Sequence, residues 1–551
     1  MTGHAGEELH NLTIAALSEM IRGKSLSPVE LTEYLLRRVE AFEPQLHAFV
    51  TLTADIALAQ ARAAEAEIMA GRWRGPLHGV PFALKDIYST AGILTTAGSR
   101  ILGDNVPDRD ATTTARLLSA GGVLLGKLKT HEFAHGGPSF DVPWAPARNP
   151  WNVDHFTGGS SSGSGAAVAA GYVPSAMGSD TGGSIRNPGS LCGLVGFKPT
   201  YGIVSRAGVI PNSYSFDTCG PLTRSVEDAA ILLNLLAGHD DADPASVAVP
   251  PRDYRAAVSD ADVRGLRVGV LRHFWEEDLP ANDEVRAAME RAITHFTDLG
   301  CFVEDARIRP LQDFYDVKVL IAEPEMFEAY AADLRSRVQE FGLDFLGRCL
   351  PACMVTATDY MAAQRERRRM NDEMRLTYDR YDILLTAGPY GPAPRIDAHS
   401  TMAFWKNPSV NTPFNVTGGP AIVLPMGLSA SELPLSLQLT GRPFDDVTVL
   451  RAARAYERSA GFDGLRPPLD PDAPPVLWNG PRPQQPEKAD ISPGERDVVA
   501  AAARRHGLTL DDVVFEQICC AAPHILAMSE RVGARTAGRF DEPANVFLAP
   551  R

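Results

Sequence analysis

Two glycine-rich segments that contain serine, and one lysine, carry the strongest chemical signal in this sequence. The segments are Gly158–Gly165 and Gly178–Arg186, and Lys85 directly follows the apolar run Gly79–Leu84. A serine hydroxyl becomes a good nucleophile only when a neighbouring base takes its proton, and a neutral lysine can be that base. The combination is therefore typical of acyl transfer, although either serine segment alone is more often a turn-rich loop.

Three blocks, taken together, resemble the amidase signature family of amide hydrolases. Gly158–Gly171 is similar to the family's Gly-Gly-Ser-Ser block, and Gly178–Arg186 is similar to its Asp-Thr-Gly-Gly-Ser-Ile-Arg block. Cys192–Thr200 is similar to the block that follows, and the resemblance continues as far as Gly441–Pro443. One departure is Ser162, where the family usually has glycine. The resemblance implies an α/β fold in which a mixed central β-sheet lies between layers of α-helices.

The resemblance also implies a role for each residue of a Ser-Ser-Lys triad. Ser184 would be the nucleophile that forms an acyl-enzyme, Ser160 the bridging serine after a cis peptide bond, and Lys85 the terminal base. The spacings resemble those of family members, with 75 residues from Lys85 to Ser160 and 24 from Ser160 to Ser184. Because only a neutral lysine can accept a proton, the site must lower the pKa of Lys85 through burial or positive neighbours.

The second serine segment would also supply the oxyanion hole. In the family, this hole is built from four backbone amides, which correspond here to Thr181, Gly182, Gly183 and Ser184. Two glycines allow such amides to converge, and one donor is worth about 3–4 kcal/mol in the transition state. We expect Asp180 and Arg186 to brace this loop as an ion pair, and Asp86 to have a similar structural role beside Lys85.

The surrounding sequence predicts the elements that position these residues. Gly79–Leu84 is a predicted strand, and the helix Thr112–Ala120 is followed by the strand Gly121–Leu128. Ser27 is a good N-cap for a helix from Pro28, and Glu30 would complete a capping box. Further strands are predicted at 267–271, 382–386, 421–425 and 435–440, and a helix at 283–299. This alternation is typical of a layered α/β domain.

The C-terminal part of the sequence has a different character. Nine prolines fall within residues 466–493, so this segment is a stiff linker or a strap over the surface. Ser492–Glu495 is a second capping box, and the helix that it begins should stop at Gly507. A further helix is predicted over about 510–532, bent or split at Pro523. We therefore expect a catalytic domain, a linker and a helical tail at 1–465, 466–490 and 491–551.

Two other motifs suggest different chemistry. His131–His135 matches the H-E-x-x-H zinc motif, but Gly136–Pro138 would stop the helix that this motif needs. Gly159–Gly163 matches the G-x-S-x-G elbow of α/β-hydrolases with Ser161 as nucleophile, but residues 149–157 before it are loop-like, where a strand is required. We expect neither a metal nor another cofactor.

Composition narrows the choice of partners. The chain has 551 residues, of which 53 are basic and 68 acidic, for a formal charge of −15. Direct binding to nucleic acid or anionic lipid is therefore not expected. The sequence shows no signal peptide, no apolar run of membrane-spanning length and seven scattered cysteines, which predicts a reduced, cytoplasmic protein. The expected partner is a small-molecule amide, and a homodimer is an open alternative.

The predicted function is hydrolysis of a carboxamide C–N bond to a carboxylate and ammonia or an amine. The alternative is a glutaminase (A) subunit of a tRNA amidotransferase, which supplies ammonia to a partner. Arg367 falls where such subunits have an arginine for the glutamine carboxylate, although a surface arginine is an equal alternative. An inactive amidase fold that serves as a binding subunit is a third class.

The tail and residues 300–400 bear on the substrate. The tail, above all Phe540–Phe547, resembles small helical accessory proteins that strap around some family hydrolases, which favours a self-sufficient hydrolase. In relatives, residues 300–400 shape the pocket and vary with the substrate. The pocket candidates, which could equally be core residues, are Tyr315, Phe327 and Trp405.

Overall fold

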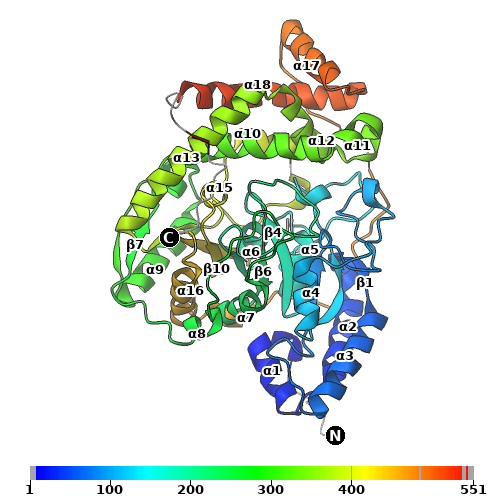
Figure 1. The fold of residues 1–551 in the computed structure, drawn as a ribbon, viewed down its shortest axis with the longest axis vertical. Coiled ribbons are helices and arrows are strands. Elements are labelled where there is room, and N and C mark those ends of the chain that lie inside the picture. The colour runs from blue at the N-terminus through cyan, green and yellow to red at the C-terminus, as the bar shows by residue number, and fades with distance from the viewer. Residues whose placement is uncertain (1–7, 399, 483–484, 536–541, 544–551) are drawn as a thin grey trace.

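The computed structural model describes residues 8–398, 400–482, 485–535 and 542–543 of the chain. Eleven strands of this described part form one mixed sheet (Figure 1). In spatial order they are β1 (Phe49–Leu52), β3 (Val123–Leu128), β2 (Pro81–Lys85), β4 (Ser175–Asp180), β6 (Thr218–Thr223), β5 (Val195–Lys198), β10 (Ala421–Leu428), β11 (Pro434–Gly441), β9 (Ile383–Ala387), β7 (Arg267–Val270) and β8 (Phe302–Asp305).

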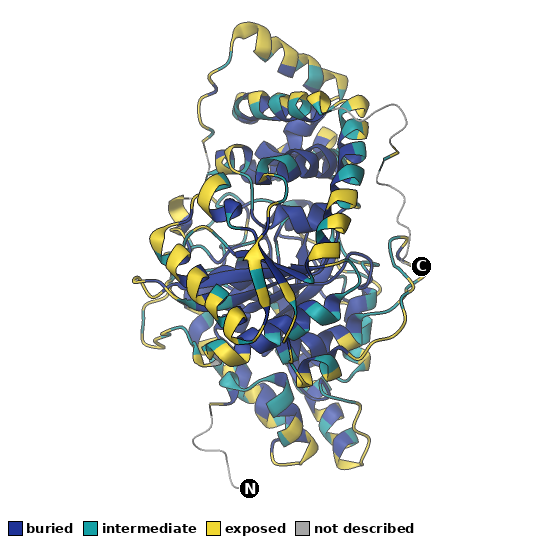
Figure 2. Cartoon of the chain, turned by 90° about the vertical axis from the view of Figure 1, so that its left-hand side faces the viewer, coloured by how far each residue is buried: buried dark blue, intermediate teal, exposed yellow. Residues whose placement is uncertain are grey.

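Helices surround this sheet, with their buried sides inward and their exposed sides outward (Figure 2). Before the middle of the chain they are α1 (Ile14–Arg22), α2 (Pro28–Leu46), α3 (Ala54–Met69), α4 (Thr112–Ser119), α5 (Ser162–Ala169), α6 (Arg186–Leu191), α7 (Val226–Leu236), α8 (Tyr254–Ser259) and α9 (Asp283–Asp298). After it they are α10 (Leu311–Ala329), α11 (Ala331–Ser336), α12 (Leu343–Cys349), α13 (Ala357–Arg380), α14 (Thr401–Lys406), α15 (Thr412–Val416), α16 (Asp446–Ala460), α17 (Pro493–Arg505) and α18 (Asp512–Ala534). The predicted α/β fold class is confirmed.

The position of β2 and β4 decides where polar residues can meet. The two strands pair in parallel, with Leu84 opposite Met177, and every residue of both is buried. Parallel strands end at the same edge of a sheet, and this edge is where open α/β sheets place ligands. Lys85 ends β2 and Asp180 ends β4, so the lysine and the second serine segment emerge side by side.

Most predicted elements form where the pattern placed them, including β2, α4, β3 and α9. The capping box predicted at the start of α2 is only half formed. Ser27 Oγ accepts the backbone N–H of Val29 and Glu30 at 3.0 and 3.3 Å, as predicted. However, the same hydroxyl donates to Glu65 Oε1 at 2.5 Å on the neighbouring helix α3, so a tertiary contact replaces the local one with Glu30.

The proline-rich segment runs over the surface as a strap. Gln45 Nε2 donates to the carbonyl of Asp470 at 2.9 Å, and Val476 N donates to the carbonyl of Pro44 at 3.0 Å, so the segment is fastened to the end of α2. Further along, the backbone N–H of Ala489 donates to Glu516 of α18 at 2.6 Å. These contacts favour the strap over a free linker.

The tail forms two helices and packs onto the rest of the chain. Ser492 and Glu495 make the predicted capping box of α17, and α18 continues through Pro523 as one helix without splitting. Figure 1 shows α17 and α18 above α10 and α12. Most of the segment Phe540–Phe547, on which part of the tail's resemblance rests, lies outside the described residues. No helix in the described ranges is long and apolar enough to cross a membrane.

Candidate active site

The lysine and the bridging serine of the predicted triad are in direct contact. Lys85 Nζ lies 2.7 Å from Ser160 Oγ, and both side chains are buried. The Gly159–Ser160 peptide bond is cis, as the resemblance implied. A second hydroxyl, that of Ser179 on β4, lies 2.9 Å from the same ammonium nitrogen. The lysine is therefore held at a fixed point by two serines.

Ser184 lies beside this pair. The backbone N–H of Ser161 donates to the carbonyl of Ser184 at 3.3 Å, which joins the two serine segments next to Ser160. Ser184 is half-buried and lines a cavity, whereas Ser160 and Lys85 are enclosed behind it. The arrangement places the most accessible of the three groups toward a substrate and the base in the interior.

Burial changes the acid–base behaviour of Lys85. The side chain is fully buried, and the loss of solvation lowers its pKa from the ordinary 10.5 to about 7. The carboxylates of Asp217 and Asp180 act in the opposite direction, but they do not outweigh burial. A substantial fraction of Lys85 is therefore neutral near pH 7, as a proton acceptor must be.

Asp180 and Arg186 form the predicted ion pair. Arg186 Nε and Nη2 donate to the two carboxylate oxygens of Asp180 at 3.0 and 2.8 Å, with both side chains fully buried. Burial alone would raise the pKa of Asp180, but Arg186 and Asn415 hold it far below its usual range. Asp180 Oδ1 also accepts the backbone N–H of Gly183 at 2.8 Å. This pair therefore fixes the loop before Ser184 and engages one of the four predicted oxyanion donors.

Asp86 has a structural partner, but it is not Lys85. Asp86 Oδ1 lies 3.3 Å from the buried ammonium of Lys127, and Oδ2 accepts both the amide and the hydroxyl of Thr96. Ser162, where the family usually has glycine, is the first residue of α5 and is buried, with its hydroxyl 3.4 Å from the carbonyl of Lys129. The substituted position thus begins a regular helix beside the triad.

The cavity lined by Ser184 has a volume of about 220 Å³. Its floor is the predicted oxyanion loop Thr181–Ser184, and its other walls include residues of α10, α12 and α14, namely Tyr315, Lys318, Arg348 and Phe404. Of the three pocket candidates from the sequence, Tyr315 lines this cavity, while Phe327 and Trp405 do not and are buried core residues. Ser179 and the two cations were missed. Alternation along β4 could have found Ser179, since it shares a face with Met177.

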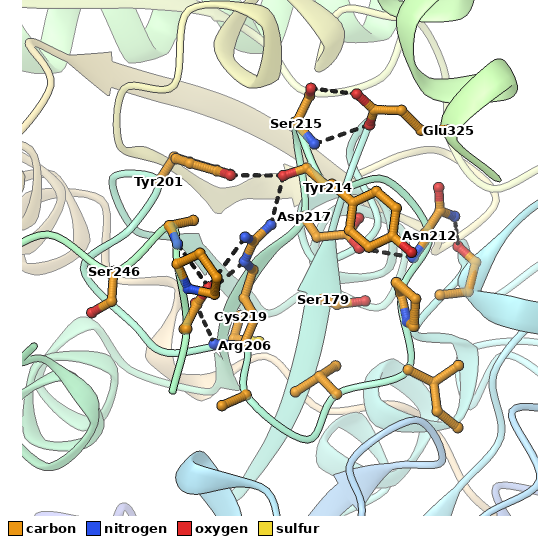
Figure 3. Close-up of a pocket in the computed structure, with 18 of the residues that line it drawn as sticks. Ser179, Tyr201, Arg206, Asn212, Tyr214, Ser215, Asp217, Cys219, Ser246 and Glu325 are labelled. Carbon is orange, nitrogen blue, oxygen red and sulfur yellow. Dashed lines mark hydrogen bonds and ion pairs between the residues drawn. The ribbon is translucent and has the colours of Figure 1, made fainter. Parts of the chain in front are cut away.

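A larger cavity of about 1100 Å³ lies on the lysine side of the triad (Figure 3). Ser179, Asp217 and Arg206 line it, and it shares Ala134 and Asn212 with the cavity of Ser184. Arg367 also lines the larger cavity and is buried, so the alternative of a surface arginine is wrong. Its guanidinium donates to the carbonyls of Val416 and Ser215 at 2.9 and 3.1 Å. Arg367 does not line the cavity of Ser184.

The two competing motifs do not have the structures that their chemistry requires. Glu132–Ala134 is a short 3-10 turn, and Phe133 and Ala134 have left-handed φ angles of 48° and 58°, so the helix of the zinc motif is not formed. Ser161, the elbow candidate, is fully buried, with its hydroxyl 3.3 Å from the carbonyl of Ser179. No strand precedes it in residues 149–157.

Comparisons with known proteins identify the family. The family model Amidase matches residues 30–450. The chain is 38% identical over 487 residues to the A subunit of glutamyl-tRNA(Gln) amidotransferase from Moorella thermoacetica, a match that covers 84% of this chain and 99% of that protein. The chain belongs to the amidase family, and it is an amidohydrolase.

Solved structures agree with this assignment. The peptide amidase of Stenotrophomonas maltophilia superimposes with a TM-score of 0.73 at 32% identity, over 83% of this chain and 98% of that one. A bacterial aryl acylamidase of the amidase signature family superimposes with a TM-score of 0.75 at 28% identity, again over 83% and 98%. The fold is therefore that of amidase signature enzymes.

Proposed function

We propose that this chain hydrolyses small carboxamides through an acyl-enzyme on Ser184, with Ser160 and Lys85 as proton relay and base. Ser184 Oγ attacks the amide carbon while its proton passes to Ser160, and the proton of Ser160 passes to neutral Lys85. The C–N bond then breaks, and the leaving amine takes the proton back along the same path. Water attacks the ester on Ser184, and the carboxylate leaves.

Charge that develops on the carbonyl oxygen needs backbone donors. We assign this role to the amides of the loop Thr181–Ser184, which line the cavity. Gly183 already donates to Asp180, so its amide acts by holding the loop or by sharing its hydrogen bond. Gly183 has a φ of 125° and lies close to Asn411, where a Cβ atom would meet the side chain at 2.6 Å. Only glycine fits this turn without rearrangement.

The contact between Lys85 and Ser160 carries the proposal. A fully buried lysine with a pKa near 7, 2.7 Å from a serine hydroxyl, is a base without a carboxylate partner in hydrogen-bond contact among the described residues. A lysine held only for stability would be expected to pair with a carboxylate, as Lys127 does with Asp86. Perturbed pKa values of this kind cluster at functional sites.

The nucleophile can be tested by covalent labelling. A fluorophosphonate probe is expected to label wild type at Ser184, because this hydroxyl faces the cavity and its proton has a base to accept it. Peptide mass spectrometry identifies the site, and release of ammonia or amine from aryl, alkyl and carbamoyl amides measures activity. Ser161→Ala is the matched control and should still be labelled. Labelling that persists in Ser184→Ala would contradict the proposal.

A glutaminase subunit is the second candidate, because the curated relative at 38% identity belongs to an amidotransferase of several subunits by its name. Hydrolysis of simple amides by the purified chain alone favours a self-sufficient hydrolase. Activity confined to glutamine, and only with added partner subunits, favours the second candidate. All seven cysteines are free thiols, in keeping with the proposed cytoplasmic location.

We further propose that the tail braces the wall of the substrate cavity. Ile525 and Met528 of α18 are buried in one apolar cluster with Tyr315, a residue of the cavity wall. Arg531 donates to the two oxygens of the buried Asp316 of α10 at 2.8 and 2.7 Å. The tail therefore contacts the helix that carries much of the cavity wall.

Replacing Ile525 with aspartate is expected to lower both the melting temperature and kcat/KM. The side chain is only 1% exposed, and an unpaired carboxylate there costs several kcal/mol, so α18 should leave its site. Thermal unfolding and steady-state kinetics measure the two effects. Leu526→Asp is the matched control, since this neighbour is 40% exposed and should tolerate the charge. Equal effects of the two substitutions would count against a bracing tail.

A further inference from the structure

The charged groups that face the Ser184 cavity are positive. Lys318 of α10 and Arg348 of α12 both line the cavity. Among the described residues that line it, none is an aspartate or a glutamate. A cavity that presents cations and no carboxylate favours a ligand of negative charge.

Carboxylates do balance these cations, but they lie behind them. Lys318 Nζ is 2.9 Å from Glu323 Oε1, and Arg348 Nε and Nη2 are 3.1 and 3.2 Å from the carboxylate of Asp344. Neither Glu323 nor Asp344 lines the cavity. His135 Nε2 lies 3.0 Å from the second oxygen of Glu323, and His135 and Lys318 hold the pKa of Glu323 at about 2 against the effect of burial. The carboxylates therefore anchor the cations and leave them facing the substrate.

Lys318 keeps donors for a ligand. Its ammonium has three N–H groups, and the hydrogen bonds found among the described residues use one of them, to Glu323. Its side chain is nearly buried. A buried donor without a partner is costly, so a ligand oxygen at this point would be favourable.

An aromatic ring holds the two cations in place. The ring of Phe404 lies 5.4 Å from Lys318 Nζ and 4.7 Å from Arg348 Cζ, so both cations lie over its face. The hydroxyl of Tyr315 donates to the backbone carbonyl of Phe404 and fixes this residue. The cationic wall is thus built by three different helices, α10, α12 and α14, and is not a single flexible side chain.

The cationic wall is also close to the reacting group. A Cβ atom on Gly182 would lie 3.5 Å from Lys318 Cε, so the lysine stem passes directly over the loop that carries Ser184. The cavity of about 220 Å³ holds on the order of seven waters. A ligand that fills it is therefore small, and both of its ends lie within a few bonds of the scissile carbonyl.

We propose that this site takes short amides that carry a carboxylate, and that Lys318, assisted by Arg348, determines this specificity. Short monoamides of dicarboxylic acids are the substrate class that fits. The carboxylate accepts from Lys318 while the amide carbonyl lies on the oxyanion loop next to Ser184. This inference rests on the proposed amidase function of the same site.

The test compares succinamate with isocaproamide, a neutral amide of nearly the same shape. Wild type is expected to prefer succinamate by on the order of 10²-fold in kcat/KM, the usual worth of a hydrogen bond to a charged group. Lys318→Met should remove most of this preference by raising KM for succinamate, with a much smaller change for isocaproamide. Lys406→Met is the matched control, because its exposed side chain lies outside the cavity, and it should keep the preference.

A second variant guards against misfolding. Lys318→Met alone leaves Glu323 with one partner fewer, whereas Lys318→Met/Glu323→Gln removes the ion pair as a unit and should show the same lost preference. Equal rates of wild type on the two amides, or an equal loss on both in the double variant, would overturn the inference while the amidase function stands.

Binding separates this inference from the proposed function. Succinate, a product of succinamate hydrolysis, is titrated calorimetrically into the full-length Ser184→Ala protein with and without Lys318→Met. The expected result is at least a tenfold weaker Kd with Lys318→Met, whether or not wild type hydrolyses any amide. Absent binding to the Ser184→Ala protein, or equal binding to the two proteins, overturns the anion site independently of catalysis.

Discussion

Replacing Lys85 with methionine is expected to lower kcat by on the order of 10³- to 10⁴-fold, the range typical for removal of a general base that acts with a nucleophile. Methionine fills a similar volume but cannot accept a proton from Ser160. Ser184→Ala should cost at least as much. Because residues that act as a unit are not additive, the double variant should fall little further than Ser184→Ala.

The pH dependence gives an independent check on the same prediction. Burial lowers the pKa of Lys85, so its neutral, active form accumulates as the pH rises through about 7. Wild-type kcat/KM should therefore rise about tenfold per pH unit well below pH 7 and level off above it. The residual activity of Lys85→Met should lack this limb.

Lys198→Met is the matched control. Lys198 is equally buried, and burial also lowers its pKa to about 7. However, its ammonium donates to the carbonyl of Pro199 at 3.0 Å and touches neither catalytic serine. This variant should keep the pH profile of wild type. A profile without the limb near pH 7 in wild type, or a Lys85→Met enzyme within tenfold of wild type, would exclude Lys85 as the base.

Local sequence predicted the parts of the site that lie at the ends of local elements. The apolar run before Lys85 predicted β2, and the glycines around Ser184 predicted a tight loop, because glycine and β-branched patterns act over a few residues. The family resemblance added their roles. The parallel pairing of β2 with β4 then placed both at one sheet edge, which a motif alone does not state.

The groups that the sequence did not predict depend on contacts between distant segments. Lys318 lies in α10, whose residues are buried on almost all sides, so the pattern gave no reason to place this one cation in a cavity. Its partners Glu323 and Phe404, and the loop at Gly182, meet only in the fold. For the same reason Ser27 bonds to Glu65 and not to Glu30. Tertiary contacts outweigh local preferences at such points.

Replacing Arg186 with methionine is expected to lower the free energy of unfolding by about 3–5 kcal/mol, because it leaves Asp180 as a buried charge without its cation. Arg186 is fully buried and joins Asp180 to three other segments of the chain. Besides Asp180, its guanidinium donates to the carbonyl of Asn411, to Gln438 Oε1 and to Asn415 Oδ1 at 2.8, 2.7 and 2.6 Å. Urea unfolding measures the loss, and kcat should fall as well, because Asp180 fixes the loop of Gly183.

The comparison with an exposed pair isolates the effect of burial. Arg267 binds Asp382 with the same two-pronged geometry, with the closest contact at 2.7 Å, but the side chains are 44% and 30% exposed. Arg267→Met should therefore cost less than about 1 kcal/mol. Asp180→Asn/Arg186→Met removes both buried charges and should recover part of the stability, though not the activity, since a neutral amide cannot replace both carboxylate oxygens. If Arg186→Met were as mild as Arg267→Met, the loop before Ser184 would be held by its glycines and backbone alone.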